Sequence, residues 1–338
     1  MMRDPAFWWR PAGLAAGLLS PLATVYGAVA AWRMARPGQI GPEPVVCIGN
    51  LTLGGAGKTP TVLAVAQILG AAGREPYALS RGYGGTQTGS VRVDLAVHRA
   101  VDVGDEPLLL ARFVPTVVAR DRFAGAVTAG TLGAHSIVMD DGFQNPSLRK
   151  DLSILVVDGR RGIGNGRVFP AGPLRAPLDA QLRRADALLT IGPGVAGEAV
   201  SAAAQARGLR VFHGRLEPDA KALAGLRGHP VLAFAGIGDP EKFFATLRDA
   251  GMDVRARLSF PDHHRFRRSE ALNLVSRAER EGLLLVTTEK DLARLAGQDD
   301  LAALAGISRA LPVTLSVVED DAFRDLILKA SSPASAVT

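Results

Sequence analysis

The 338-residue sequence predicts an α/β protein of two units, a larger one built on a mostly parallel sheet and a smaller α/β one that follows it. Short apolar runs alternate with helical patterns, and these runs are apolar throughout, as in parallel strands covered on both faces. A second alternating series begins near Gly228. We therefore expect an N-terminal helical segment over residues 1–36, the larger unit over 37–225, the smaller unit over 226–330 and a flexible tail over 331–338.

The N-terminal segment is apolar enough to associate with a membrane. Residues 11–32 carry no charge, and many of them are small. The three tryptophans of the chain, Trp8, Trp9 and Trp32, stand at the two ends of this stretch, as aromatic rings do at the headgroup level of a bilayer. Pro21 interrupts the stretch, which makes it a poor spanning helix.

The larger side chains of this segment form one helical stripe, which is typical of a helix that lies on a bilayer. The stripe consists of Leu14, Leu18, Leu22, Val25 and Val29. Two alternatives stay open, a secretory signal and a core helix packed on its own domain.

In the larger unit, an apolar strand over Val45–Ile48 precedes a glycine-rich turn and a helix from Lys58 to about Ala72. Further buried strands are expected at Tyr77–Ser80, Thr116–Ala119, Ser136–Met139, Ser153–Val157 and Ala187–Ile191. Glycines and prolines predict a long irregular loop over 159–177, and a helix is expected at 200–207.

In the smaller unit, strands are expected at Val231–Ala235, Val254–Leu258, Leu283–Thr287 and Val313–Val317, and helices at Pro240–Ala250 and Ser269–Glu281. Two α/β units of this kind predict a cleft between them.

Composition sets broad limits on function. Hydrophobic residues make up 47% and charged residues 21%, the balance of a globular protein with a sizeable core. The single cysteine, Cys47, excludes an internal disulfide framework. The net charge of +6 favours an anionic partner. Only six residues are lysine, and the arginines are scattered, so we expect no nucleic-acid partner.

The run 49–59, GNLTLGGAGKT, follows a strand and opens a helix. Its glycines let several N–H groups face one anion at the positive end of the helix dipole. Lys58 can reach the β- and γ-phosphates of ATP, and the Thr59 hydroxyl can ligate Mg²⁺. The usual motif has glycine where this chain has Thr52. The run indicates a P-loop kinase-like larger unit, whose expected ATP-binding residues are Thr52, Gly54, Gly55, Ala56, Gly57, Lys58 and Thr59.

Two adjacent carboxylates end a neighbouring apolar strand. Asp140 and Asp141 follow the run 136–139 and precede a glycine. P-loop enzymes need an acidic group at such a strand end to hold Mg²⁺ or its water shell. Asp140 and Asp141 are therefore the candidate metal ligands beside Thr59, and Gln144 in the same run is a further site candidate.

Several short runs together resemble one family, the tetraacyldisaccharide 4′-kinases of lipid A biosynthesis. They occur in the family's order and cover most of residues 45–291. The runs are GNLTLGGAGKTP (49–60), SRGYGG (80–85), VGDEP (103–107), DDGFQ (140–144), NGRVFPAGPLR (165–175), FPDHH (260–264) and TTEKD (287–291). The family's P-loop also tolerates a residue other than glycine at its first position. The chain departs from the family pattern at Asn145, where His is usual, and at Ala176, where Glu is usual.

This resemblance implies transfer of the ATP γ-phosphoryl group to the 4′-hydroxyl of an acylated glucosamine disaccharide 1-phosphate, which forms lipid IVA. The acyl chains of this acceptor lie in a membrane, which accounts for an apolar N-terminal helix. We therefore expect the protein at the cytoplasmic face of the bacterial inner membrane, peripheral or monotopic. Its expected partners are ATP with Mg²⁺, the disaccharide lipid and the membrane surface.

An alcohol acceptor needs a group that orients it and takes its proton. Asp105 in VGDEP is the candidate base, with Glu106 beside it. His263 is the candidate partner that orients Asp105 and tunes its basicity, and Asp262 is the candidate that holds His263. Because Asp105 belongs to the larger unit and His263 to the smaller, closure of the cleft would assemble the pair.

Other residues are candidates for the transfer step or for substrate contact. Lys58 stabilises charge on the phosphates and is counted as catalytic, and Arg120 and Arg122 follow a strand end from which they could neutralise the transferring group. Tyr83 and Asn165 are candidates for substrate contact.

Two other functions stay open. A P-loop GTPase or metallochaperone would need an Asn/Thr-Lys-x-Asp element, which residues 288–291 match only loosely because Glu289 stands where Asn belongs. A non-catalytic, membrane-tethered scaffold would bind lipid without turning over nucleotide.

Overall fold

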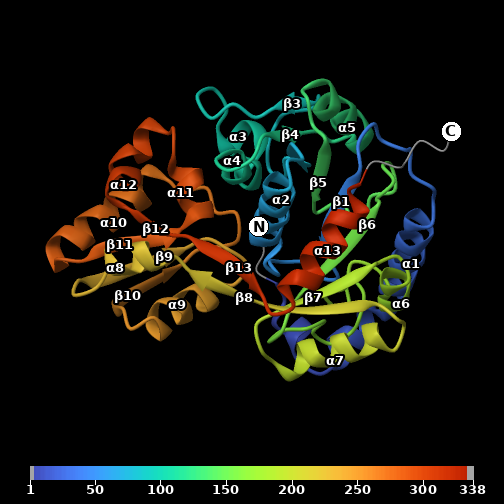
Figure 1. Ribbon diagram of the computed structural model, residues 1–338. Coiled ribbons are helices and arrows are strands. Elements are labelled where there is room, and N and C mark those ends of the chain that lie inside the picture. The colour runs from blue at the N-terminus through green and yellow to red at the C-terminus, as the bar shows by residue number, and fades with distance from the viewer. Residues whose placement is uncertain (1–3, 333–338) are drawn as a thin grey trace.

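The structure, a computed structural model, describes residues 4–332 and consists of two bodies joined by neighbouring strands (Figure 1). Of the tail expected over 331–338, residues 333–338 lie outside the described part. Ser331 is buried, and its hydroxyl donates to the Ile327 carbonyl, so the expectation of a flexible tail is wrong at this residue.

The larger body is a nine-stranded sheet with the order β13-β8-β7-β6-β1-β5-β2-β4-β3. Its inner strands pair in parallel, and only the two edge strands, β13 and β3, run antiparallel to their neighbours. The strands are β1 (Val45–Asn50), β2 (Pro76–Ser80), β3 (Val91–Arg92), β4 (Thr116–Val118), β5 (Ser136–Asp140), β6 (Leu152–Asp158), β7 (Ala187–Ile191), β8 (Arg210–Pro218) and β13 (Val313–Val317). β1, β5, β6 and β7 are buried along their whole length, which confirms the expectation from their continuous apolar sequences.

Helices cover both faces of this sheet (Figure 1). One face packs against α2 and α13, and the other against α5, α6, α7 and the end of α1. Small helices α3 and α4 lie beside β4. The helices of this body are α1 (Leu14–Met34), α2 (Lys58–Ala71), α3 (Ala100–Val103), α4 (Asp105–Ala111), α5 (Arg122–Thr131), α6 (Leu178–Leu182), α7 (Val195–Gln205) and α13 (Asp320–Ala330). The segment 159–177 contains neither helix nor strand, as its glycines and prolines predict.

The smaller body is a four-stranded parallel sheet with the order β10-β9-β11-β12. Its strands are β9 (Pro230–Ala235), β10 (Asp253–Ser259), β11 (Leu284–Thr288) and β12 (Arg309–Leu311). One face packs on α10 (Arg268–Glu281), α11 (Glu289–Leu295) and α12 (Ala302–Ile307). The other face packs on α8 (Ala220–Ala224) and α9 (Pro240–Asp249).

The boundary expected at residue 330 for the smaller unit is wrong at its C-terminal end. The strand 313–317 pairs antiparallel with β8 in the larger sheet, and α13 packs on α2. The physical reason is that β8, which the sequence analysis missed, has unpaired backbone N–H and C=O groups along one edge. The strand 313–317 pairs with these groups when the chain comes back to the larger body. The smaller body is therefore an insertion between β8 and β13 of the larger body.

The N-terminal helix α1 runs unbroken through Pro21 for 21 residues, so the expected interruption is wrong. Proline costs a helix one backbone bond, which the remaining turns tolerate. α1 is the one helix among residues 4–332 that is long and apolar enough to cross a membrane. The predicted stripe is exposed over its whole length: Leu14, Leu18, Leu22, Val25 and Val29.

The opposite side of α1 lies on the larger body. Gly27 packs closely against Pro177 and Val168 of the long loop, and Ala16, Ala23 and Met34 are buried. Trp8, expected at headgroup level, is also buried, and its Nε1 donates to the Pro170 carbonyl. That expectation is therefore wrong for Trp8, because its indole N–H has a partner inside the protein. Trp32 is exposed.

Candidate active site

The glycine-rich loop joins β1 to α2 at the carboxyl edge of the larger sheet. Gly54 and Gly57 have φ of 97° and 93°, which favour glycine. A Cβ at Gly57 would also lie 2.6 Å from the terminal methyl of Ile191, so a larger residue would have to displace that side chain as well as strain the backbone. The Asn50 side-chain amide donates to the Gly54 carbonyl at 3.0 Å and closes the turn. The helix α2 then begins at Lys58, as a phosphate-binding loop requires.

The long loop 159–177 holds the P-loop from the other side. The Leu53 N–H donates to the Pro173 carbonyl at 2.8 Å, and Arg175 Nε donates to the Thr52 carbonyl at 2.9 Å. Arg175 also forms two parallel bonds to Asp141, of 2.9 and 3.1 Å. Sequence analysis gave Arg175 no role, and its position within a loop of no regular structure explains the omission.

Asp141 anchors cations at the P-loop. Its Oδ1 lies 3.7 Å from Lys58 Nζ, and its backbone has the left-handed φ of 52°. Although burial acts to raise it, the pKa of Asp141 lies well below its usual value because Lys58 and Arg175 stabilise the charged form. Burial lowers the pKa of Lys58, and Asp141 opposes that effect. Asp141 therefore holds both cations at the glycine-rich loop.

Asp140 has a different environment from its neighbour. Its side chain is buried, and its Oδ1 finds no hydrogen-bond partner within residues 4–332. Burial and the nearby Asp141 raise the pKa of Asp140. Thr59 is also buried, at the first turn of α2. A buried carboxylate oxygen with no partner, within electrostatic range of the P-loop lysine Lys58, has the donor chemistry that Mg²⁺ prefers.

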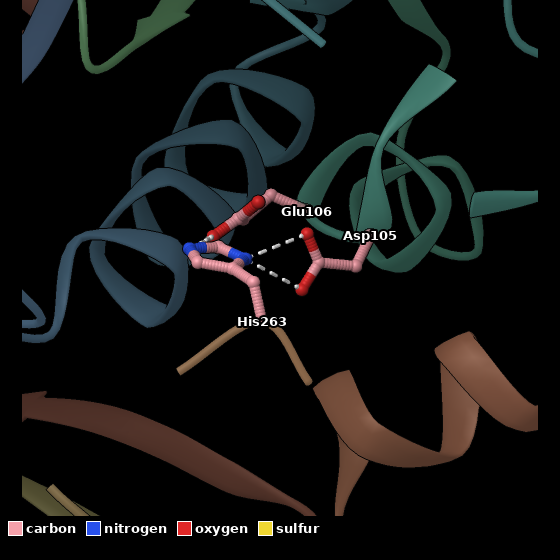
Figure 2. Close-up of side chains that lie close together, drawn as sticks. All are labelled: Asp105, Glu106 and His263. Carbon is pink, nitrogen blue, oxygen red and sulfur yellow. Dashed lines mark hydrogen bonds and ion pairs between the residues drawn. The ribbon is translucent and has the colours of Figure 1, made fainter. Parts of the chain in front are cut away.

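The two bodies bring Asp105 and His263 together (Figure 2). Asp105 is the first residue of α4 in the larger body, and His263 lies on the loop after β10 in the smaller one. His263 Nδ1 lies 3.2 Å from each carboxylate oxygen of Asp105. Its Nε2 lies 3.8 Å from both Glu106 and Asp262. The expected pairing across the cleft is therefore present in this structure.

The backbone of His263 is held in an unusual conformation. Its φ is 53°, uncommon for a residue with a side chain, and its N–H donates to the Gly236 carbonyl at 3.1 Å and to Asp262 Oδ1 at 3.0 Å. Burial acts to lower the pKa of His263, but hydrogen bonding to Asp105 and the charge of Glu106 raise it overall. His263 is therefore cationic over a wider pH range than an ordinary histidine.

Helix α11 supplies two cations, Lys290 and Arg294, for which the sequence analysis gave no partner at the site. Lys290 Nζ donates to Glu106 Oε1 at 3.1 Å, and Arg294 Nε donates to Asp105 Oδ2 at 2.7 Å. Residues four apart lie on the same side of a helix, so their spacing was a usable signal. Despite the opposing effect of burial, the pKa of Lys290 is raised by Glu106 and Asp105.

Lys290 also interacts electrostatically with Asp140 and Lys58. Lys290 therefore lies within electrostatic range of the P-loop cluster as well as in contact with Glu106 beside Asp105.

Asp105, Glu106 and His263 offer donor atoms that all lie within 4.8 Å of one another, the spacing of a metal site. Their partners argue otherwise, because Lys290 and Arg294 already neutralise the two carboxylates. The arrangement fits a hydrogen-bonded acid–base group better than a cation cage.

The remaining candidates occupy varied positions. Arg120 is exposed, whereas Arg122 is buried and donates to the Ala119 carbonyl at 2.6 Å. Gln144 donates to the Asn50 carbonyl at 2.9 Å and to Gln181, which supports the strand before the P-loop. Asn165 holds its own loop, through a bond to the Ala171 carbonyl. The ring of Tyr83 lies 5.3 Å from that of His263.

The side chains of residues 288–291, which loosely match a guanine-specificity element, form contacts inside the protein. Asp291 is fully buried and accepts hydrogen bonds from the Gly236 N–H and the Thr288 hydroxyl, and Lys290 is paired with Glu106. Neither side chain is free to face a purine base, which disfavours the GTPase alternative.

The smaller body contacts the P-loop directly. A Cβ at Gly238 would lie 3.4 Å from the Gly55 nitrogen, so the loop after β9 lies against the P-loop. Lys242 Nζ also bonds Asp158 at the end of β6, at 2.7 Å. Arg160 and Arg161 of the larger body form ion pairs with Asp239 of the smaller body.

Comparisons with known proteins agree on one family. The model of the tetraacyldisaccharide-1-P 4′-kinase family matches residues 15–332. A tetraacyldisaccharide 4′-kinase of Bradyrhizobium sp. (strain BTAi1) is 55% identical over 326 residues, which are 96% of this chain and 94% of the relative. That of Methylobacterium sp. (strain 4-46) is 58% identical over 322 residues, 95% of each chain. A crystal structure of LpxK from Aquifex aeolicus, an "apo" form in complex with ATP, superimposes with a TM-score of 0.73 at 27% identity and covers 94% of this chain and 100% of its own.

Proposed function

Because the chain belongs to the tetraacyldisaccharide-1-P 4′-kinase family, we propose roles for its cleft residues in the reaction of that family. The protein is a lipid A 4′-kinase, which binds ATP and transfers its γ-phosphoryl group to the 4′-hydroxyl of a tetraacyldisaccharide 1-phosphate. One observation carries the assignment of roles. The smaller body touches both groups of residues, because its Gly238 lies against Gly55 of the P-loop and its His263 pairs with Asp105, so the phosphate-binding and proton-accepting groups border the same body.

The P-loop binds the phosphates of ATP through its N–H groups and Lys58. Asp141 keeps Lys58 and Arg175 at the loop, and both cations stabilise charge on the transferring group. This role of Asp141 differs from the metal role expected from sequence, because Arg175 occupies both of its oxygens.

Asp105 orients the acceptor hydroxyl and takes its proton. The 4′-oxygen forms a bond to the γ-phosphorus while the bond from that phosphorus to the β–γ bridging oxygen breaks, and ADP leaves with the electron pair. The proton passes to Asp105. Although burial opposes it, His263 and Arg294 hold the pKa of Asp105 well below its usual value, which makes Asp105 a weak base. A weak base suffices, because the attacking oxygen becomes strongly acidic once it is bonded to phosphorus.

Asp140 and Thr59 are the residues that fit Mg²⁺. The unpartnered, buried Oδ1 of Asp140 supports this role. Mg²⁺ at these residues would neutralise charge on the β- and γ-phosphate oxygens.

The exposed stripe of α1 supports association with a membrane surface. Its apolar side chains lie on the side of the helix that faces away from the larger body. Arg33 and Arg36 follow this stripe, and arginine side chains attract anionic lipid. We place the protein at the cytoplasmic face of the bacterial inner membrane, where ATP and an acylated acceptor meet.

The assay that tests these roles uses γ-labelled ATP and tetraacyldisaccharide 1-phosphate in mixed micelles. Wild-type protein should yield a labelled bisphosphorylated lipid. D105N should bind ATP with wild-type affinity and form at most about one-hundredth as much product, the usual scale of a lost general base. Near-normal turnover by D105N would refute Asp105 as the base.

A further inference from the structure

Arg294 is a buried cation of the smaller body whose side chain reaches the proposed base of the larger body. Arg294 and Asp105 are both almost inaccessible to solvent. Arg294 Nε donates to Asp105 Oδ2 at 2.7 Å, and a second nitrogen of the guanidinium forms an ion pair with the same oxygen. The guanidinium therefore engages one oxygen of Asp105.

The third nitrogen of Arg294 is fixed within its own body. Nη1 donates to Asp291 Oδ1 at 2.7 Å and to the Gly236 carbonyl at 2.6 Å. Asp291 is itself held by the Gly236 N–H at 3.1 Å and by the Thr288 hydroxyl at 2.7 Å. The guanidinium thus has little freedom to rotate, since buried hydrogen bonds fix its plane from behind.

Gly236 also ties Arg294 to His263. The carbonyl that accepts from Arg294 Nη1 also accepts from the His263 backbone N–H at 3.1 Å. A Cβ at Gly236 would lie 3.0 Å from Asp291 Oδ1, so glycine at this position lets the Asp291 carboxylate lie close to the backbone. Both partners of Asp105 therefore come from the smaller body and are set relative to each other by one carbonyl group.

We propose that Arg294 is a positioning residue, which immobilises Asp105 in its ionised form and sets the orientation of this base from the smaller body. The inference rests on the proposed role of Asp105. Of the two oxygens, Arg294 engages Oδ2, which leaves Oδ1 with capacity for the acceptor hydroxyl beside its contact with His263.

The charged groups around Asp105 determine what removal of Arg294 would do. They are Glu106 on α4, His263 and Asp262 on the loop after β10, and Lys290, Asp291 and Arg294 on α11. Without Arg294, two buried carboxylates lose their shared cation, and protonation of Asp105 becomes easier. The loss of activity should then depend on pH, which loss of a merely structural contact would not produce.

The test compares R294M, R294K and the control R277M, whose arginine forms an exposed ion pair with Glu281 on α10. We measure kcat and KM for ATP from pH 5.5 to 9 with the full-length protein. R294M should keep the KM for ATP and lose kcat, with a loss about tenfold greater at pH 5.5 than at pH 8.5, because burial alone raises a carboxyl pKa by up to about 3–5 units and Arg294 is one of the charges that oppose this effect at Asp105. R294K should restore part of the kcat that R294M loses at pH 5.5, and R277M should match wild type.

The following outcomes separate the hypotheses. A folded R294M with the wild-type pH profile, or with one uniform loss, overturns the inference. If R294M does not fold, R294K decides, because wild-type kcat with lysine means that the fixed guanidinium plane is not required. D105N is measured in parallel: if D105N is inactive and R294M follows the wild-type profile, only the role of Arg294 fails, whereas an active D105N removes the proposed base itself.

Discussion

Replacing two leucines on the exposed stripe of α1 tests membrane association without disturbing the fold. Leu18 and Leu22 are 82% and 63% exposed. Full burial of a leucine side chain contributes about 2 kcal/mol, so burial of these exposed parts in a bilayer is worth roughly 3 kcal/mol for the pair. The double variant L18S/L22S should therefore bind anionic vesicles about a hundredfold more weakly.

The assay is co-sedimentation with vesicles of stated anionic content, together with a thermal melt and an ATP-binding measurement. The control V195S/L272S removes two exposed apolar side chains elsewhere, at 86% and 52% exposure. This control should bind vesicles as wild type does. Unchanged vesicle binding by L18S/L22S would refute the membrane role. A lower melting temperature with lost ATP binding would instead support a helix of the core.

Three further predictions concern the cleft. K58A should lower kcat/KM by about a hundredfold or more, roughly 3 kcal/mol of transition-state stabilisation, and near-normal initial rates would contradict the P-loop assignment. D140A should raise the Mg²⁺ concentration needed for half-maximal rate, whereas D141A should raise the KM for ATP without rescue by Mg²⁺; identical Mg²⁺ titrations would remove the distinction between the two carboxylates. His263 has a raised pKa, so its ion pair with Asp105 is complete below the ordinary histidine pKa and is lost as pH rises through the raised value. The rate of wild type should therefore fall over that alkaline range, and the pH–rate profile of H263Q should not show this fall. If H263Q shows the same fall, the titration belongs to another group.

The larger sheet was predictable because its central strands are buried on both faces. Val45–Ile48 is apolar throughout, and so are the four residues that follow Ser153. Short apolar runs that alternate with helices are typical of buried parallel strands. β8 was missed for the opposite reason. Its residues alternate between buried and exposed, and it contains three charged side chains, Arg210, Arg215 and Glu217, so no apolar run marks it.

The site was predictable where one motif carries the chemistry. Lys58 and Thr59 follow from the glycine loop, and Asp140 follows from a strand end beside it. Arg294 could not be placed in the same way, since its meaning depends on the approach of two bodies. The sequence around a buried arginine in a short helix does not show which carboxylate it will contact, so its role cannot be predicted before the structure is known.

The route of the chain between the two bodies has an engineering consequence. Residues 219–312 leave and re-enter the larger body beside each other, where the Asp219 N–H donates to the Pro312 carbonyl at 2.9 Å and β8 pairs with β13. The smaller body is thus a cassette inserted into a hairpin, and a short turn could close the gap left by its excision. The cassette carries His263 and Arg294, so exchange of this one segment between relatives would replace both partners of Asp105 while the nucleotide-binding body kept its own strand order.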